Sequence, residues 1–79
     1  MRIKLKKNEY TQLNTSDVSF IIQNISNSDI GLIKSYSKPS NDDMPDIVLK
    51  PYDGVNDNIM NGIFWGKASI DGLEVGVVE

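Results

Sequence analysis

The 79-residue sequence contains no cysteine and no histidine. Without cysteine the fold cannot be held by disulfide bonds, and without either residue the usual zinc sites cannot form. Nucleophilic catalysis by a thiol, or by a serine that is paired with a histidine, is excluded for the same reason. The sequence also carries no glycine motif for phosphate binding. We therefore expect no cofactor, no metal site and no enzymatic activity.

Long apolar runs and helical periodicity are also missing. No stretch approaches the roughly 20 apolar residues of a membrane span, and no apolar segment of a signal peptide follows the basic start. No segment places apolar residues at i, i+3, i+4 and i+7 over three turns. We therefore expect no helix longer than one turn, no membrane association, and synthesis in a cytoplasm.

The formal net charge of −3 argues against general nucleic-acid binding. One segment is nevertheless basic: residues 2–6 alternate basic and apolar side chains, as in a half-buried strand. Its basic members are Arg2, Lys4 and Lys6, and Lys7 follows. We interpret this face as solvated, or as lysines that guard a sheet edge. A nucleic-acid-binding β-barrel that uses these residues is a less favoured alternative, because no aromatic residue is interleaved with them.

The strongest structural signal is the dipeptide Asp71-Gly72, which stands between two β-rich runs near the C-terminus. Asp-Gly is typical of a two-residue type I′ turn, in which both residues have positive φ. The sequence therefore predicts a C-terminal hairpin that pairs Ala68 with Val75. Replacing Gly72 by a β-branched residue should then be costly.

The same register brings Trp65 opposite Val78 at the open end of the hairpin. Trp65 has two interpretations. It could cover the edge of the core, or it could anchor an interface, since tryptophan is enriched at contact hot spots.

Two further apolar runs, residues 18–25 and 30–36, are predicted to form a hairpin around a loop at residues 26–29. Both faces of this hairpin are apolar, yet a domain of this size has one core and covers only one of them well. The second face is therefore expected to be buried by self-association. Its members are Ile21, Ile25, Ile30 and Leu32.

Residues 37–46 contain two prolines and small polar residues, which exclude a central strand. The acidic residues Asp42, Asp43 and Asp46 match no calcium-loop spacing. Short strands are expected at residues 47–50 and near residue 59. We therefore predict one all-β domain, residues 1–79, built as a small antiparallel β-sandwich or barrel of five to seven short strands with a C-terminal Asp-Gly hairpin.

Taken together, the order of these features resembles a group of small one-domain β-sandwich proteins of phage virions. The segments that carry the resemblance are Val18–Asn24, Ile30–Ile33, the loop Pro39–Pro45, Ile47–Pro51, Gly62–Ala68 and the Val-rich end of the chain. The resemblance implies a capsid decoration protein or a head or tail accessory protein. It implies no catalytic residues.

The leading hypothesis is thus a non-enzymatic phage virion structural protein, made in the host cytoplasm. We expect it to form a homo-oligomer, with a trimer favoured, and to bind a capsid or tail protein. The expected contact residues are Trp65, Val78, Ile21, Ile25, Ile30 and Leu32. The alternative is a carbohydrate- or receptor-binding module of a virion fibre, which would use the tyrosines Tyr10, Tyr36 and Tyr52 and the acidic loop.

Overall fold

The computed structural model describes all 79 residues and contains strands and loops but no helix. Every strand pairing is antiparallel, and the strands form two four-stranded sheets. The strands are β1 (Arg2–Lys4), β2 (Thr11–Gln12), β3 (Ile21–Asn24), β4 (Ile30–Lys34), β5 (Ile47–Leu49), β6 (Gly54–Asn56), β7 (Phe64–Lys67) and β8 (Glu74–Val78). The predicted all-β sandwich is confirmed, with eight short strands where five to seven were expected.

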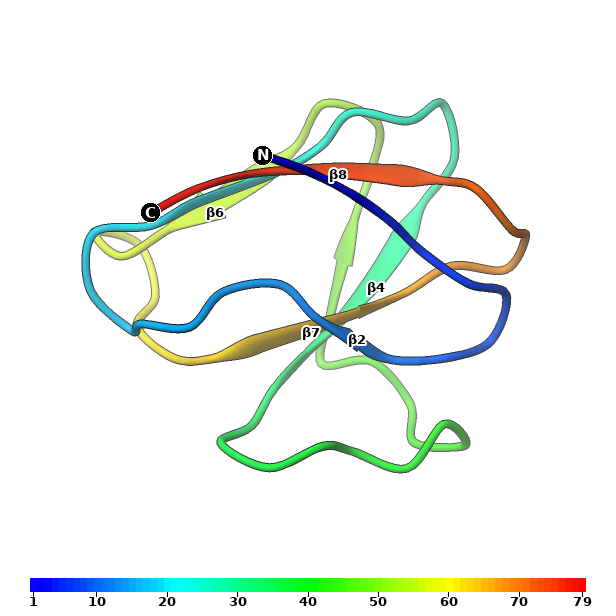
Figure 1. The fold of residues 1–79 in the computed structure, drawn as a ribbon, viewed down its shortest axis with the longest axis horizontal. Coiled ribbons are helices and arrows are strands. Elements are labelled where there is room, and N and C mark those ends of the chain that lie inside the picture. The colour runs from blue at the N-terminus through cyan, green and yellow to red at the C-terminus, as the bar shows by residue number, and fades with distance from the viewer.

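The strand order identifies the sandwich as a jelly roll. One sheet has the order β1-β8-β3-β6 and the other β2-β7-β4-β5. Four of the pairs, β1 with β8, β2 with β7, β3 with β6 and β4 with β5, are those of one long folded hairpin. Rolling that hairpin up adds the pairs β3 with β8 and β4 with β7, which is the double Greek key of a jelly roll. In Figure 1, β6 and β8 lie in the upper layer and β2 and β7 in the lower one, with both chain ends near β6 and β8.

The predicted C-terminal hairpin is wrong, because β7 and β8 belong to different sheets. The turn itself is present, and Gly72 has a φ of 87° as the prediction required, but Asp71 is not among the residues with positive φ. The turn carries the chain from one sheet to the other, and its Gly72 N–H donates to the carbonyl of Leu5 at 3.0 Å. Ala68 and Val75 are both buried, so placing them on facing sheets buries both side chains between the layers.

The predicted pairing of residues 18–25 with residues 30–36 is wrong for the same reason. The loop after β3 leads from one sheet to the other, so β3 pairs with β6 and β8 while β4 pairs with β5 and β7. Ile30 and Leu32 are therefore completely buried in the protein's own core. Neither residue can belong to an outer contact face, contrary to the prediction.

The core lies between the two sheets and takes one residue in two from the strands, as the period of a strand requires. Phe20 and Phe64 meet at its centre with their ring centroids 5.8 Å apart. Its members are Leu5, Leu13, Phe20, Ile22, Ile30, Leu32, Leu49, Val55, Phe64, Ala68, Leu73, Val75 and Val77. Side chains fill the interior, so any contact or ligand site must lie on the outside.

Candidate protein contact surface

The outer face of the β1-β8-β3-β6 sheet carries an exposed apolar pair. Ile21 of β3 is directly opposite Val78 of β8. The buried residues Ile22 and Val77 alternate with them along the two strands, so the side chains of Ile21 and Val78 point away from the core. Ile21 is 53% exposed and Val78 is 61% exposed. Such a pair would normally be covered, because an outer sheet face that meets water is usually polar.

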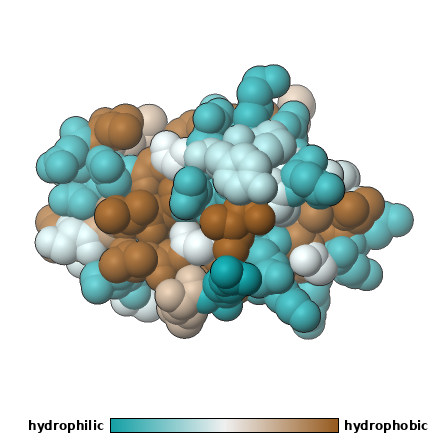
Figure 2. Space-filling model, turned by 90° about the horizontal axis from the view of Figure 1, so that it is seen from above, coloured by the Kyte–Doolittle hydropathy of each residue, from teal (hydrophilic) through white to brown (hydrophobic).

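Two further apolar side chains extend this pair into a patch. Met1 is exposed, and Ile25, just after β3, is half-buried. Together with Ile21 and Val78 they border one open hollow of about 260 Å³. We call these four residues, Met1, Ile21, Ile25 and Val78, the apolar strip. The view onto this side of the molecule shows apolar side chains gathered into a patch with hydrophilic residues around it (Figure 2).

A glycine at the middle of β8 helps to form the hollow. Gly76 stands between Arg2 and Gln23 on the neighbouring strands, and all three residues line the hollow. A Cβ atom at Gly76 would come within 3.5 Å of the Ile25 side chain. The missing side chain therefore leaves a depression beside Ile25 that a partner's side chain could enter.

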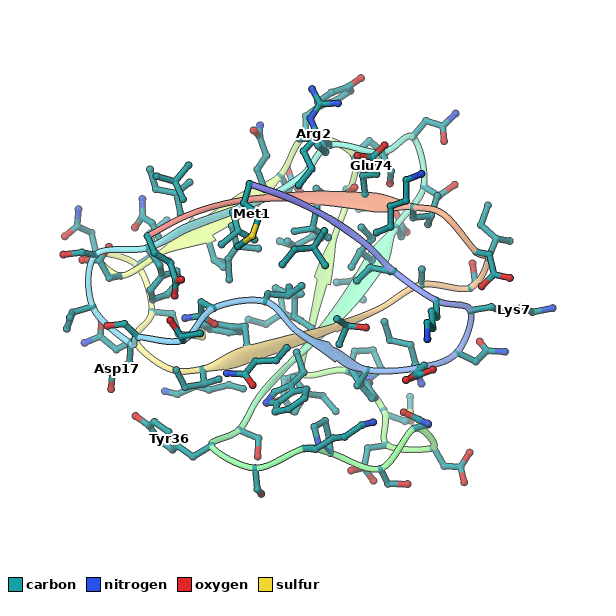
Figure 3. The ribbon with its side chains drawn as sticks, in the orientation of Figure 1. Met1, Arg2, Lys7, Asp17, Tyr36 and Glu74 are labelled. Atoms are coloured by element: carbon teal, nitrogen blue, oxygen red, sulfur yellow. The ribbon has the colours of Figure 1, made fainter.

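The rim of the strip is polar and charged. Arg2 and Glu74 project from the same outer face in Figure 3, and Lys4 is directly opposite Glu74. An apolar centre with a polar rim is the composition of a protein–protein interface. The four side chains of the strip are apolar, so its chemistry fits contact with another protein.

Trp65 lies elsewhere, and its predicted meeting with Val78 does not occur. It belongs to β7 in the other sheet, where its neighbours across the strands are Gln12 and Ile33. Its ring is half-buried, and its Nε1–H donates to the carbonyl of Ser35 at 2.9 Å. Trp65 therefore holds the start of the loop that follows β4 and is not part of the apolar strip.

The three tyrosines do not form one platform for a sugar ring. Tyr10 is buried, with its hydroxyl donating to the carbonyl of Asp43 at 2.8 Å. Tyr36 is exposed, and its hydroxyl donates to the Asp17 carboxylate at 2.8 Å. Both residues lie at the lower left in Figure 3. This hydrogen bond and the charge of Asp17 raise the pKa of Tyr36 above its ordinary value. Tyr52 is exposed on the loop before β6.

Two carboxylates of the acidic loop already accept hydrogen bonds from backbone N–H groups. Asp43 accepts a hydrogen bond from the Ser40 N–H at 3.0 Å, and Asp46 accepts one from the Lys34 N–H at 3.2 Å. Both carboxylates thus shape the loop. The open hollow beside this loop, about 580 Å³, has a mostly polar lining that includes both lysines and aspartates, so it favours no single charge of ligand.

The sequence predicted three of the four strip residues as contact residues, namely Ile21, Ile25 and Val78, and missed Met1. The period of two along residues 18–25 predicted that Ile21 and Ile25 share a face, and both line the hollow. Met1 and Gly76 were not predicted as site residues. The alternation in residues 2–6 was a signal for the strand that brings Met1 to this face, but it did not show that β1 pairs with β8.

Comparison with known proteins gives no relative: no family model matches the chain, and neither a curated protein nor a solved structure matches it. The structure contains no helix that is long and apolar enough to cross a membrane.

Proposed function

We propose that this protein is a non-enzymatic structural component of a phage virion, which self-associates through the apolar strip and binds a capsid or tail protein. The observation that carries the proposal is the exposed cross-strand pair Ile21 and Val78, extended by Met1 and Ile25. Side chains with these exposed fractions present an apolar area on the order of a few hundred Å². A patch of this size on a small domain is typical of an interaction site.

Self-association fits the size and composition of the chain. A domain of 79 residues without cysteine has a thin core and no disulfide bonds to compensate for it. A closed symmetric oligomer would cover the strip and would present one composite surface to a larger partner. We favour a trimer, in which three copies of the strip meet around the axis.

The phage assignment has two supports. The order of sequence features resembles that of small virion proteins, and the jelly roll is an architecture that viral capsid domains use. Fold analogy alone does not give function, because lectins and cupins use the jelly roll too. The apolar composition of the strip favours an assembly role over either of those.

Particle composition tests this function. Virions purified from a host whose phage carries the gene should contain the chain in many copies, as measured by peptide mass spectrometry. The double variant Ile21→Asp, Val78→Asp should be absent from particles, although it accumulates in the cell. The variant Val48→Asp is the matched control, because Val48 is also 53% exposed but lies on β5 of the other sheet. Absence of the wild-type chain from the particles would refute the proposal.

A further inference from the structure

The free edge of β1 presents backbone groups that are ready to pair with another strand. Met1 and Val77 exchange both of their backbone hydrogen bonds at 2.8 Å, and the Leu5 N–H donates to the carbonyl of Leu73 at 2.8 Å. In an antiparallel pair, hydrogen-bonded residues alternate with residues whose backbone groups point away. The N–H and C=O groups of Arg2 and Lys4 therefore point outward, and β1 has no neighbour on that side.

The side chains along this edge are mostly basic and would favour an acidic partner. Four of the eight basic residues of the chain lie at positions 2–7. No side-chain nitrogen of the four lies within 4.0 Å of a carboxylate oxygen, since the one ion pair of the protein joins Lys38 and Glu9; the Asp71 carboxylate accepts the backbone N–H of Lys7 at 2.6 Å. The edge is therefore predominantly basic on a protein whose net charge is negative, although Glu74 is directly opposite Lys4 on β8.

Between the basic residues, Ile3 provides an apolar contact. It points toward the core, against which it packs, and it is half-buried at the rim of the sandwich. A strand added beside β1 would alternate in the same way as β1 itself. Its acidic residues would lie beside Arg2 and Lys4, and its apolar residues would cover the exposed part of Ile3.

The other sheet edges are less suited to accept a strand. Pro45 and Pro51 bracket β5, and Pro51 also precedes β6. The edge beside β2 is closed by the loop after β4, because the Asn41 side chain accepts the Tyr10 N–H at 3.0 Å. Prolines and covering loops are common protections of sheet edges. β1 has neither, and is protected from other copies of itself only by its positive charges.

We propose that the β1 edge binds an extended segment of another protein that alternates acidic and apolar residues, by adding it as a fifth strand to the β1-β8-β3-β6 sheet. Backbone hydrogen bonds to Arg2 and Lys4 supply the pairing, and the basic side chains supply the specificity. A second copy of β1 is not the partner, because like charges directly opposite each other are destabilising. This edge site adjoins the apolar strip, because Arg2 also lines the hollow of the strip, but it uses outward backbone groups that the strip does not use and does not depend on the proposed function.

A peptide titration tests the proposal. The probe is a capped peptide of sequence Asp-Val-Glu-Val-Asp, and the control replaces each acidic residue with lysine. In nitrogen-15 NMR spectra, the acidic peptide should shift the amide signals of Arg2 and Lys4 and slow the hydrogen exchange of both amides. The basic peptide should do neither, and added salt should weaken the acidic peptide. Shifts that are spread over the surface without slowed exchange of these two amides would overturn strand addition.

Variants separate the charge from the backbone pairing. Lys4→Glu should weaken acidic-peptide binding about three- to tenfold, while Lys50→Glu, an equal charge change at an exposed site after β5, should not. Lys4→Pro should still fold, because a proline is tolerated where the N–H faces outward from an edge strand, and it should bind more weakly than Lys4→Ala. Equal binding by Lys4→Pro and Lys4→Ala, or by Lys4→Glu and wild type, would refute the site. If Lys4→Pro does not fold, the exchange data and Lys4→Glu still decide.

A neutral strip variant, Ile21→Ser, Val78→Ser, changes no charge beside Arg2 and should bind the acidic peptide as wild type does. Loss of peptide binding in that variant would place the peptide on the apolar strip and would contradict the edge site. Peptide binding that persists while self-association is lost shows two independent surfaces. The two proposals can thus fail separately.

Discussion

The side-chain amide of Asn24, at the end of β3, donates a buried hydrogen bond of 2.9 Å to the backbone carbonyl of Leu49 in β5 of the opposite sheet. The same amide group donates to the carbonyl of Ser28 at 2.7 Å, and its oxygen accepts the Ser26 N–H at 2.9 Å. Asn24 is completely buried. One polar side chain therefore shapes the loop that leads from β3 to the opposite sheet, and it connects the two layers.

Replacing Asn24 by leucine should destabilise the fold by about 2–4 kcal/mol. The substitution leaves two carbonyl groups and one N–H at this buried position without their partner, and each unsatisfied buried group costs about 1–3 kcal/mol before relaxation. Denaturant unfolding measures the loss. Asn27→Ala is the control, because Asn27 is exposed in the same loop and should change stability by less than about 0.5 kcal/mol. Equal effects of the two substitutions would show that Asn24 does not link the sheets.

The two glycines of the C-terminal segment should respond in opposite ways to alanine. Gly72 has a φ of 87°, and no atom would crowd a Cβ there, so Gly72→Ala tests backbone strain alone and should cost on the order of 1 kcal/mol. Gly72→Val should cost about 1–3 kcal/mol. Gly76 is in β8 without a positive φ, and its Cβ would make only an ordinary contact.

Gly76→Ala should consequently be neutral or stabilise by up to about 1 kcal/mol, because alanine restricts the unfolded chain. Thermal melts of the variants provide the comparison. A stable Gly72→Val protein together with a destabilised Gly76→Ala protein would contradict the backbone conformation described here.

Tyr10 should make stability depend on pH in the alkaline range. Burial raises the pKa of its phenol above the ordinary value of 10.0, and the charges of Asp43 and Asp46 raise it further. Since the folded pKa is the higher one, the neutral phenol contributes stability that is complete below pH 10.0. That contribution is lost as the pH rises through the raised folded pKa.

The absorbance titration of Tyr10→Phe, subtracted from that of the wild type, isolates the Tyr10 phenol. It should show Tyr10 ionising above pH 10.0. The free energy of unfolding, measured across the same pH range, should depend less on pH in Tyr10→Phe than in the wild type. That variant should also lose about 1 kcal/mol at neutral pH, with the hydrogen bond to the Asp43 carbonyl. Tyr52→Phe, at an exposed position, should leave neutral-pH stability unchanged. A Tyr10 phenol that titrates below pH 10.0 would contradict its buried position.

The sequence predicted strands better than it predicted their partners. Alternation identified the strands that contain Ile3, Ile21 and Val77, because a half-buried strand has a period of two whichever strand it pairs with. The Asp71-Gly72 rule found a turn with positive φ but assumed a hairpin. Short-range turn chemistry does not show whether the next strand stays in the same sheet or crosses the core.

The same gap explains the contact residues. Ile30 and Leu32 were expected on an outer face because β4 was paired with β3, and the crossing of the loop after β3 puts them at the centre of the core. Ile21 stayed on the outside because its face is fixed by the buried Ile22 beside it. The residue opposite Val78 depends on long-range strand pairing. The sequence predicted Trp65 at that position, and the structure has Ile21 there.

The central claim is that the apolar strip joins copies of this protein. Sedimentation equilibrium at micromolar concentration should show a wild-type species above the monomer mass of 8.8 kDa, with a trimer favoured. Ile21→Asp combined with Val78→Asp should give a folded monomer, and Val48→Asp should sediment as wild type does. A wild-type protein that remains monomeric, or a double variant that keeps the wild-type mass, would contradict the claim.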